Sequence, residues 1–261
     1  MKNILKKILP KFIYLTFLEF VQKINLPKSS LSSKEYWTRH NVYSPVLSTY
    51  HEYLDFYDWR NKSYLNFSEL MPVHGHDKKT IVDYGCGPGI ELAAFAYRNK
   101  YKKLIGVDVS STALQKARQR LESFNLECQF ILLEEEKSTL PIESASVDLI
   151  HCSGVLHHTP NPIDILKEFK RILRFEGKAQ VMIYNYDSVF FHLYISYVQM
   201  ILNKRRLFKS NIYKNMSRKE VFRMHTDGLT CPISECWKVK EFIQMVNQAG
   251  MHCEFKGSAV D

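Results

Sequence analysis

The sequence lacks the cysteine spacings that mark a disulfide framework or a zinc centre. Its six cysteines are scattered through apolar or turn-like contexts, and none forms a C-x-x-C pair. Cys231 and Cys236 lie close together, but a zinc site would need a second ligand pair, which His252 and Cys253 only half supply. We therefore predict unpaired buried thiols in a reducing, cytoplasmic setting, and no metal site.

The sequence also lacks an apolar run long enough to cross a bilayer. In the apolar N-terminus the longest stretch free of charge is residues 12–18, whereas a membrane-spanning helix needs ~20 residues. Glu19 follows directly and no small-x-small cleavage site appears, which disfavours a signal peptide. Residues 1–26 still show an amphipathic, basic helical pattern. This segment either covers the protein's own core or makes a peripheral membrane contact.

Acidic residues are scarce in two segments. Residues 1–40 hold eight Lys and Arg against two Glu, and residues 204–223 hold eight against one. Because these segments account for most of the net charge of +9, the rest of the chain is mildly acidic. A nucleic-acid enzyme would more naturally be basic around its cleft, so nucleic acid is disfavoured as a partner. The two basic segments could nevertheless bind phosphates or an anionic membrane.

The pattern of apolar and polar residues changes near Lys79. Residues 27–33 are typical of a linker, and residues 36–64 are rich in Tyr and Trp, which suggests a helical lead-in beside a pocket. We assign residues 1–78 to a helical, basic and aromatic extension that caps the rest. From Lys79 onward, short apolar runs alternate with amphipathic segments, which is the pattern of a parallel sheet with connecting helices.

The alternation predicts five strands and their helices in order. Strands are expected at residues 80–84, 104–108, 128–133, 147–152 and 178–184, and helices at 91–99, 112–124 and 162–173. Ser110 or Ser111 is the expected N-cap of the second helix, and Gly177 is expected to end the third. Residues 187–235 form an inserted helical segment over the substrate side. A helix at 239–249 and a last strand from 252 to about 259 complete the domain of residues 79–261.

This pattern predicts an α/β protein: a Rossmann-like, mostly parallel sheet with helices on both faces, an N-terminal helical extension and a helical insertion after strand five. The turn after the first strand runs from Asp83 into Gly85-x-Gly87-x-Gly89. Glycine lets the backbone turn sharply and approach a ligand, which a helix N-terminus then also faces. A dinucleotide fingerprint has G-x-G-x-x-G, and here the third glycine falls one place early, which disfavours NAD.

A second feature, Asp108, ends the second strand. A carboxylate at this position can accept hydrogen bonds from both ribose hydroxyls of an adenosyl group. The alternative is that Asp108 simply caps the next helix. Together, the glycine turn and this acid are far more specific than either alone.

The segment Ile81 to Gly89 resembles the first motif of class I S-adenosylmethionine-dependent methyltransferases of the ubiquinone-biosynthesis type. Residues 140–150, 153–158 and 166–177 are similar to later segments of the same family, in the same order, although Phe175-Glu176 stands where Pro-Gly is commoner. The family's usual sheet has seven strands, whereas we count six before Asp261. The strand count is therefore off by one, or the chain is a truncated form.

The resemblance implies S-adenosylmethionine as cofactor and a set of residues around it. Asp83, Gly85, Gly87 and Gly89 would cradle its methionine part, Asp108 its ribose and Val109 one face of its adenine. An acidic residue before Leu140 would meet the adenine amino group. The candidates are Glu134, Glu135 and Glu136, with Glu136 favoured by spacing and Glu135 by a longer loop. Cys152 and Ser153 would line the floor beneath the methyl group. The adjoining residues counted with the cofactor site are Tyr84, Cys86 and Ser110.

Two adjacent histidines follow the fourth strand. His157 and His158 stand where either could reach an acceptor, and a histidine with a pKa near 6.5 suits a general base if that acceptor is a hydroxyl. The alternative is that one packs and the other caps the helix beginning near Pro162. Residues 226–232 are turn-rich and are expected to form a loop near the cleft mouth, without a readable role.

We expect methyl transfer to a small-molecule or carrier- or lipid-linked acceptor, in the cytoplasm, with membrane association left open. The aromatic density at Tyr36, Trp37, Tyr43 and residues 190–197 suggests an apolar or ring-bearing acceptor, although such clusters are more often core. Two alternatives remain: a cofactor-binding partner without turnover, and an RNA methyltransferase using the basic residues 204–223. The sequence does not indicate an oligomeric state.

Overall fold

The computed structural model describes residues 31–42, 44–134, 137–198, 216–228 and 230–259. At its centre lies a five-stranded sheet in the order β3-β2-β1-β4-β5, in which every adjacent pair is parallel. The strands are β1 (Thr80–Tyr84), β2 (Lys103–Asp108), β3 (Gln129–Leu132), β4 (Val147–Ser153) and β5 (Leu173–Met182). The order reverses between β1 and β4, and the crevice at such a switch point is where open α/β sheets bind ligands.

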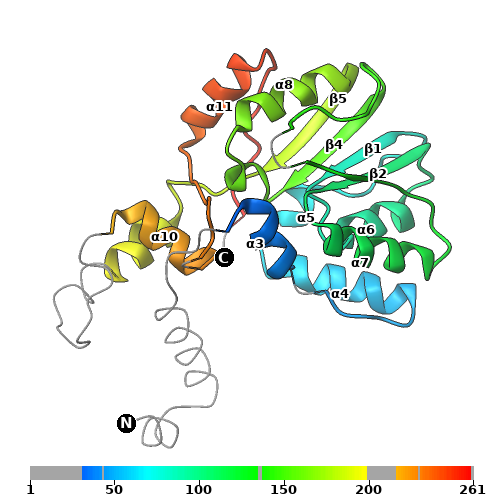
Figure 1. Cartoon of the computed structure of the whole chain (residues 1–261), viewed down its shortest axis with the longest axis horizontal. Helices are drawn as coiled ribbons and strands as arrows, with labels where there is room; N and C mark the ends of the chain where they lie inside the picture. Colours follow the sequence, from blue (N-terminus) through cyan, green and yellow to red (C-terminus); the bar gives the residue numbers. More distant parts are fainter. Residues whose placement is uncertain (1–30, 43, 135–136, 199–215, 229, 260–261) are drawn as a thin grey trace, which may run out of the picture.

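Helices cover both faces of the sheet (Figure 1), which confirms the predicted fold class. On one face, Ile81, Leu104 and Leu149 pack with α6 (Ile90–Arg98) and α7 (Ser111–Glu122). On the other, Val82, Ile105 and Ile150 pack with α8 (Pro162–Ile172) and α11 (Val239–Gln248). Neighbouring strand residues point to opposite faces, so near-continuous Ile, Val and Leu are needed when both faces are buried.

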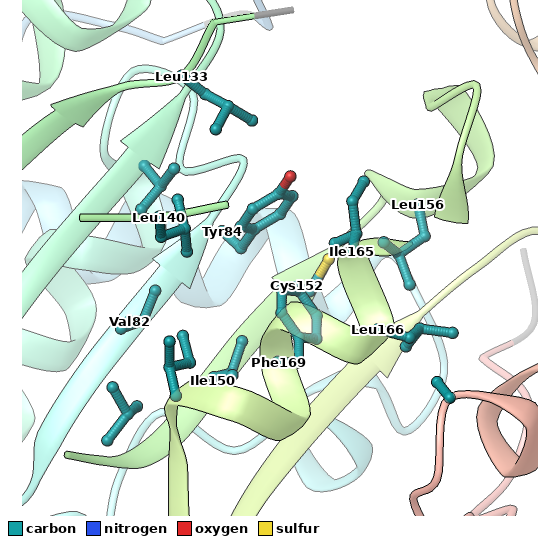
Figure 2. Close-up of a cluster of buried hydrophobic side chains, with 14 of the residues drawn as sticks. Val82, Tyr84, Leu133, Leu140, Ile150, Cys152, Leu156, Ile165, Leu166 and Phe169 are labelled. Carbon is teal, nitrogen blue, oxygen red and sulfur yellow. The ribbon is translucent and has the colours of Figure 1, made fainter. Parts of the chain in front are cut away.

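The core between the sheet and α8 is built around aromatic and aliphatic side chains (Figure 2). Phe169 of α8 is fully buried, and its ring meets the ring of Tyr84 edge-on with centroids 5.1 Å apart. Burying a side chain of this size stabilises the fold by roughly 1.5–3 kcal/mol. This packing fixes the end of β1, from which the glycine turn begins.

The described part of the N-terminal extension packs against α6 and α7. It contains α3 (Ser33–Arg39), α4 (Tyr50–Lys62) and α5 (Phe67–Leu70), and α3 and α4 each begin with a capping box. The buried Tyr53 of α4 donates its hydroxyl hydrogen bond to the carbonyl of Ile90, and Arg60 pairs with Glu91. The extension is therefore held directly against the helix that follows the glycine turn.

The described part of the insertion contains helical segments, as expected, followed by loop residues 227–228 and 230–235. The π-helical turn η2 (Phe190–Ile195) and α10 (Arg218–Thr226) pack together in a third apolar cluster that includes Phe191, Ile195, Val221 and Phe222. Figure 1 shows α10 beside the carboxyl end of the sheet, with α3 between it and the strands. Part of the predicted basic segment, up to residue 215, lies outside the described residues.

The sequence predictions differ from the structure at three places. The third helix, predicted at 162–173, is confirmed to within one residue, but Gly177 does not end it, because α8 ends at Ile172 and β5 starts at Leu173 instead of at the predicted 178. β5 bulges before it pairs again at Lys178. The linker is shorter than residues 27–33, since Ser32 caps α3 and the helix begins at Ser33.

The last strand, predicted from 252 to about 259, is also not formed, because residues 251–259 carry no strand. Met251 and Cys253 do pack against the core, as alternation predicts. The pattern indicates which side chains are buried, but it does not supply a neighbouring strand for the backbone. The sixth predicted strand is therefore wrong.

The amphipathic pattern of residues 1–26 lies outside the described residues. Within the described segments, no helix combines the length and the apolar character needed to cross a bilayer.

Candidate functional site

The glycine-rich turn is tied to the end of β2 by backbone hydrogen bonds. The N–H groups of Gly85 and Cys86 both donate to the carbonyl of Val107, at 2.7 and 3.0 Å. The N–H of Gly87 donates to a carboxylate oxygen of Asp108 at 2.8 Å. The turn and the acid that the sequence identified separately are thus in direct contact.

The glycines of the turn are needed for different reasons. A Cβ on Gly85, where φ is +76°, would lie 2.2 Å from Cγ2 of Val155 in the loop after β4. A Cβ on Gly89 would lie 2.8 Å from the Cβ of Ala117, so this glycine allows α7 to pack closely. Around Gly87, nothing lies within 4 Å of an added Cβ. The face of the turn at Gly87 is therefore open to a ligand.

Asp108 holds two backbone groups at once. One carboxylate oxygen accepts from Gly87 and the other from the N–H of Ser110 at 2.8 Å. Ser110, not Asp108, caps α7, because the Ser110 hydroxyl accepts from the N–H of Ala113 at 3.2 Å. Burial raises the pKa of Asp108, and the hydrogen bonds from Ser110 and Gly87 oppose that shift. Each oxygen keeps a lone pair with which to accept a further hydrogen bond.

Asp83 and Tyr84 carry buried polar atoms that lack partners. Oδ2 of Asp83 and the hydroxyl of Tyr84 have no hydrogen-bond partner among the described residues. Burial raises the pKa of the Asp83 carboxyl well above its usual range, and the carboxylates of Glu91 and Asp108 add to this. Buried polar groups are normally paired, so orphans at the carboxyl end of β1 indicate a missing ligand or water.

The remaining predicted cofactor residues fall into three environments. Cys86 and Cys152 are buried, and Cys152 lies in the core beside Tyr84 (Figure 2). Ser153 and Val109 are half-buried at the carboxyl ends of their strands. Glu135 and Glu136, predicted to meet the adenine, lie outside the described residues.

His157 and His158 are both buried. Nδ1 of His157 accepts from the backbone N–H of Tyr184 at 3.2 Å, and the two rings stack with centroids 3.8 Å apart. Nδ1 of His158 lies 2.8 Å from the carbonyl of Ile233, and its Nε2 lies 3.6 Å from Oδ1 of Asp227. Neither histidine caps α8, which begins after Asn161 without a side-chain cap.

Around these histidines lie Tyr36 and Trp37, which the sequence singled out as aromatic, and Tyr184 and Asp227, to which it gave no site role. The ring of Trp37 in α3 lies 4.7 Å from that of His158, and the Tyr36 hydroxyl donates to the backbone carbonyl of Asp227. Asp227 belongs to the turn-rich segment whose role we left unassigned, and its side chain accepts from the hydroxyl of Tyr184 at 3.0 Å. The turn-rich composition of residues 226–232 predicted a loop, but it did not indicate which residues Asp227 would contact.

Fold and site together define an α/β domain with a glycine-rich turn at the switch point of its sheet. Residues 75–254, more than half of the chain, match the family described as methyltransferase domain. The chain therefore belongs to the methyltransferase-domain family, and the resemblance seen in its sequence is confirmed.

Individual relatives are similar over part of the chain. A trans-aconitate 2-methyltransferase of Azoarcus sp. is 32% identical over 52% of this chain and 51% of its own length. A ubiquinone biosynthesis O-methyltransferase of Glaesserella parasuis is 29% identical over 56% of this chain and 62% of its own. Among curated relatives, the chain spans between 28% and 62% of the relative's length.

The fold is also similar to solved structures. A SAM-dependent methyltransferase of Thermotoga maritima has a TM-score of 0.50 and 17% identity, covering 84% of this chain and 81% of that one. S-adenosylmethionine is the cofactor that this family implies. The site fits it in two respects: the open face at Gly87 leaves room beside the turn, and the orphaned Oδ2 of Asp83 at the start of the turn needs a polar partner.

Proposed function

We propose that this protein transfers the methyl group of S-adenosylmethionine to a small-molecule or carrier- or lipid-linked acceptor. The observation that carries the proposal is the contact between Gly85 and Val155. It places the loop after β4 directly against the glycine turn, and the same loop continues into His158, which contacts Trp37 of α3. A cofactor cradle and an aromatic surface are thus joined by one short loop.

The chain's own residues would bind and orient the reactants. The bound cofactor supplies an electrophilic methyl group. Asp108 and the open face at Gly87 would hold its adenosyl and methionine parts, and α3, which contacts His158 and Asp227, would cover the acceptor side. Because the displacement needs little covalent help, positioning supplies most of the acceleration, on the order of 7–11 kcal/mol for well-aligned reactants.

The two histidines are better placed to position other groups than to accept a proton. His157 is fully buried, its Nδ1 accepts the Tyr184 N–H, and burial lowers its pKa well below the usual range. His158 has one ring nitrogen on a carbonyl and the other facing Asp227. We therefore infer that His157 and His158 position the neighbouring residues on the acceptor side. For His158 to accept a proton from an acceptor, its side chain would have to rearrange.

The described basic residues of α10 do not favour RNA as the acceptor. Arg218 donates to the carbonyl of Phe191 and the hydroxyl of Ser196, and Lys219 pairs with Glu235 at 3.0 Å. Arg218 and Lys219 therefore hold α10 against other residues of the insertion, and they do not form a basic surface for RNA.

The test is transfer of label from S-adenosylmethionine carrying a labelled methyl group, using fractionated cell extract as the source of acceptors. We expect label in the small-molecule or lipid fraction, and at least about tenfold less of it with the Asp108→Ala variant at low concentrations of S-adenosylmethionine. Label confined to the RNA fraction, removed by ribonuclease, would overturn the acceptor class. Tight binding of S-adenosylhomocysteine with no labelled fraction would instead favour a partner protein without turnover.

A further inference from the structure

Three potential metal ligands meet at the junction of the insertion and the loop after β4. His158 comes from the short helix η1 (Leu156–His158), Asp227 is the C-cap of α10, and Cys231 follows four residues later. One ligand atom from each lies within 4.8 Å of the other two. The three residues are almost completely buried, with the side chains of His158 and Asp227 exposed by 6% and 7% and Cys231 by 2%.

The proton on His158 can be placed from its partner. A carbonyl oxygen can only accept, so Nδ1, 2.8 Å from the carbonyl of Ile233, must carry the hydrogen. In the neutral ring Nε2 then presents its lone pair to Oδ1 of Asp227, 3.6 Å away. Two buried acceptors facing each other are unfavourable unless a positive charge lies between them.

A bound cation would satisfy both acceptors at once. The separation of 3.6 Å also suits two ligands of one ion, because each bond would be about 2.0–2.2 Å long.

The outer partners of these side chains are arranged as they are around metal ligands. Oδ1 of Asp227 accepts from Tyr184, and Oδ2 accepts from the hydroxyls of Thr226 and Ser234 at 2.8 and 2.5 Å. Metal-binding histidines commonly donate their other N–H to a backbone carbonyl, which is the role of Ile233 here. Both ligands are therefore already fixed in orientation.

We propose that Nε2 of His158, a carboxylate oxygen of Asp227 and Sγ of Cys231 bind a divalent transition-metal ion of the zinc class. Nitrogen, oxygen and sulfur donors in one small site favour zinc over magnesium or calcium. On binding, the Cys231 thiol loses its proton to solvent and becomes a thiolate ligand. Its hydrogen bond to the carbonyl of Ile233, 3.2 Å long, is then given up.

Metal binding would have two consequences. It would fasten the segment after α10 to the loop that touches the glycine turn, and so stabilise the acceptor side. Three protein ligands also leave a fourth position, which water or an acceptor atom can occupy, as in catalytic zinc sites. The inference goes beyond the proposed function and does not require turnover, because it concerns ion binding alone.

The site was not readable from the sequence. We expected no metal because the nearest cysteine to Cys231 along the chain is Cys236, and these two lack a second pair of ligands. The fold instead brings Cys231 to a histidine from a distant part of the chain, while Cys236 lies in the third apolar cluster.

The test is titration of the chelator-treated full-length protein with zinc chloride, followed by calorimetry. We expect about one equivalent to bind, and Cys231→Ser or His158→Gln to weaken binding about tenfold or more. Cys236→Ser is the matched control and should bind as the wild type does. With Co²⁺, thiolate-to-metal absorption should appear in the wild type and in Cys236→Ser, and disappear in Cys231→Ser.

Two results would overturn the proposal: a folded wild-type chain that binds no zinc, or Cys231→Ser binding zinc as tightly as wild type. Circular dichroism of each variant separates loss of ligand from loss of fold. Titration with S-adenosylhomocysteine on the same samples keeps the two proposals apart, because normal cofactor binding without zinc binding rejects the metal site alone.

Discussion

At the scale of single residues, Asp108 joins the glycine turn to the helix that follows β2. Replacing it with Ala removes the acceptor for Gly87 and Ser110 and any bond to the ribose. We expect Asp108→Ala to lose about 1.5–3 kcal/mol of binding to S-adenosylhomocysteine, which is tenfold or more in affinity. Calorimetry measures this, with the exposed Asp164→Ala as control. Near-normal affinity in folded Asp108→Ala would reject the ribose assignment.

Asp83 offers a test of a buried carboxylate. Its pKa is raised in the folded state, so the folded protein binds this proton more tightly and loses stability as pH rises above the unfolded pKa of about 3.9. Asp83→Asn removes the charge but keeps the shape. We expect Asp83→Asn to raise the melting temperature at pH 7, and the gain to vanish near pH 4. An unchanged or lower melting temperature at pH 7 would contradict this account.

At the scale of elements, the turn after β1 depends on the loop after β4. Gly85 and Gly75 have nearly equal φ values, +76° and +78°, but an added Cβ meets Val155 only at Gly85. Both substitutions to Ala should cost about 1–2 kcal/mol for the backbone conformation. We expect Gly85→Ala alone to cost more stability and to weaken binding of S-adenosylhomocysteine, because it displaces the loop.

Urea unfolding and calorimetry of the two glycine variants measure that difference. The double variant Gly85→Ala, Val155→Ala provides the internal check, because it removes the side-chain atoms in collision. It should recover part of the lost stability and affinity. Equal losses in Gly85→Ala and Gly75→Ala would show that the two elements are not coupled through this contact.

At the scale of the whole molecule, His151 links folding to pH. It is fully buried in β4, its Nδ1 accepts from Gln180, and burial lowers its pKa from 6.5 to about 4. A base with a depressed folded pKa contributes stability that is complete above pH 6.5 and is lost as pH falls toward about 4. The expected slope in that window is up to about 1.4 kcal/mol per pH unit.

Denaturant unfolding between pH 7 and pH 5 checks this linkage. His151→Gln should reduce the slope by up to about 1.4 kcal/mol per pH unit and leave the part due to the other buried histidines, while substitution of the exposed His252 by Asn should leave the slope unchanged. A wild-type slope retained in His151→Gln would assign the effect to other groups.

The sequence by itself determined the parallel sheet, its connecting helices and the turn from Asp83 to Gly89. These features follow from local rules: apolar periodicity, serine capping at Ser110, and glycine where the backbone approaches a neighbour closely. The roles of Glu135, Glu136 and residues 1–26 remain predictions, since they lie outside the described residues.

Only the tertiary structure decided where the histidines point and which side chains Asp227 and Cys231 meet. Their partners come from distant parts of the chain, and no local pattern encodes such a meeting. The strand predicted at residues 252–259 is absent for the same reason. Alternating apolar residues indicate which side chains are buried, but they do not show whether another strand lies beside them to form hydrogen bonds. The glycine turn could be identified from the sequence because its chemistry is local, whereas the surroundings of His158 are assembled from α3, the loop after β4 and the insertion.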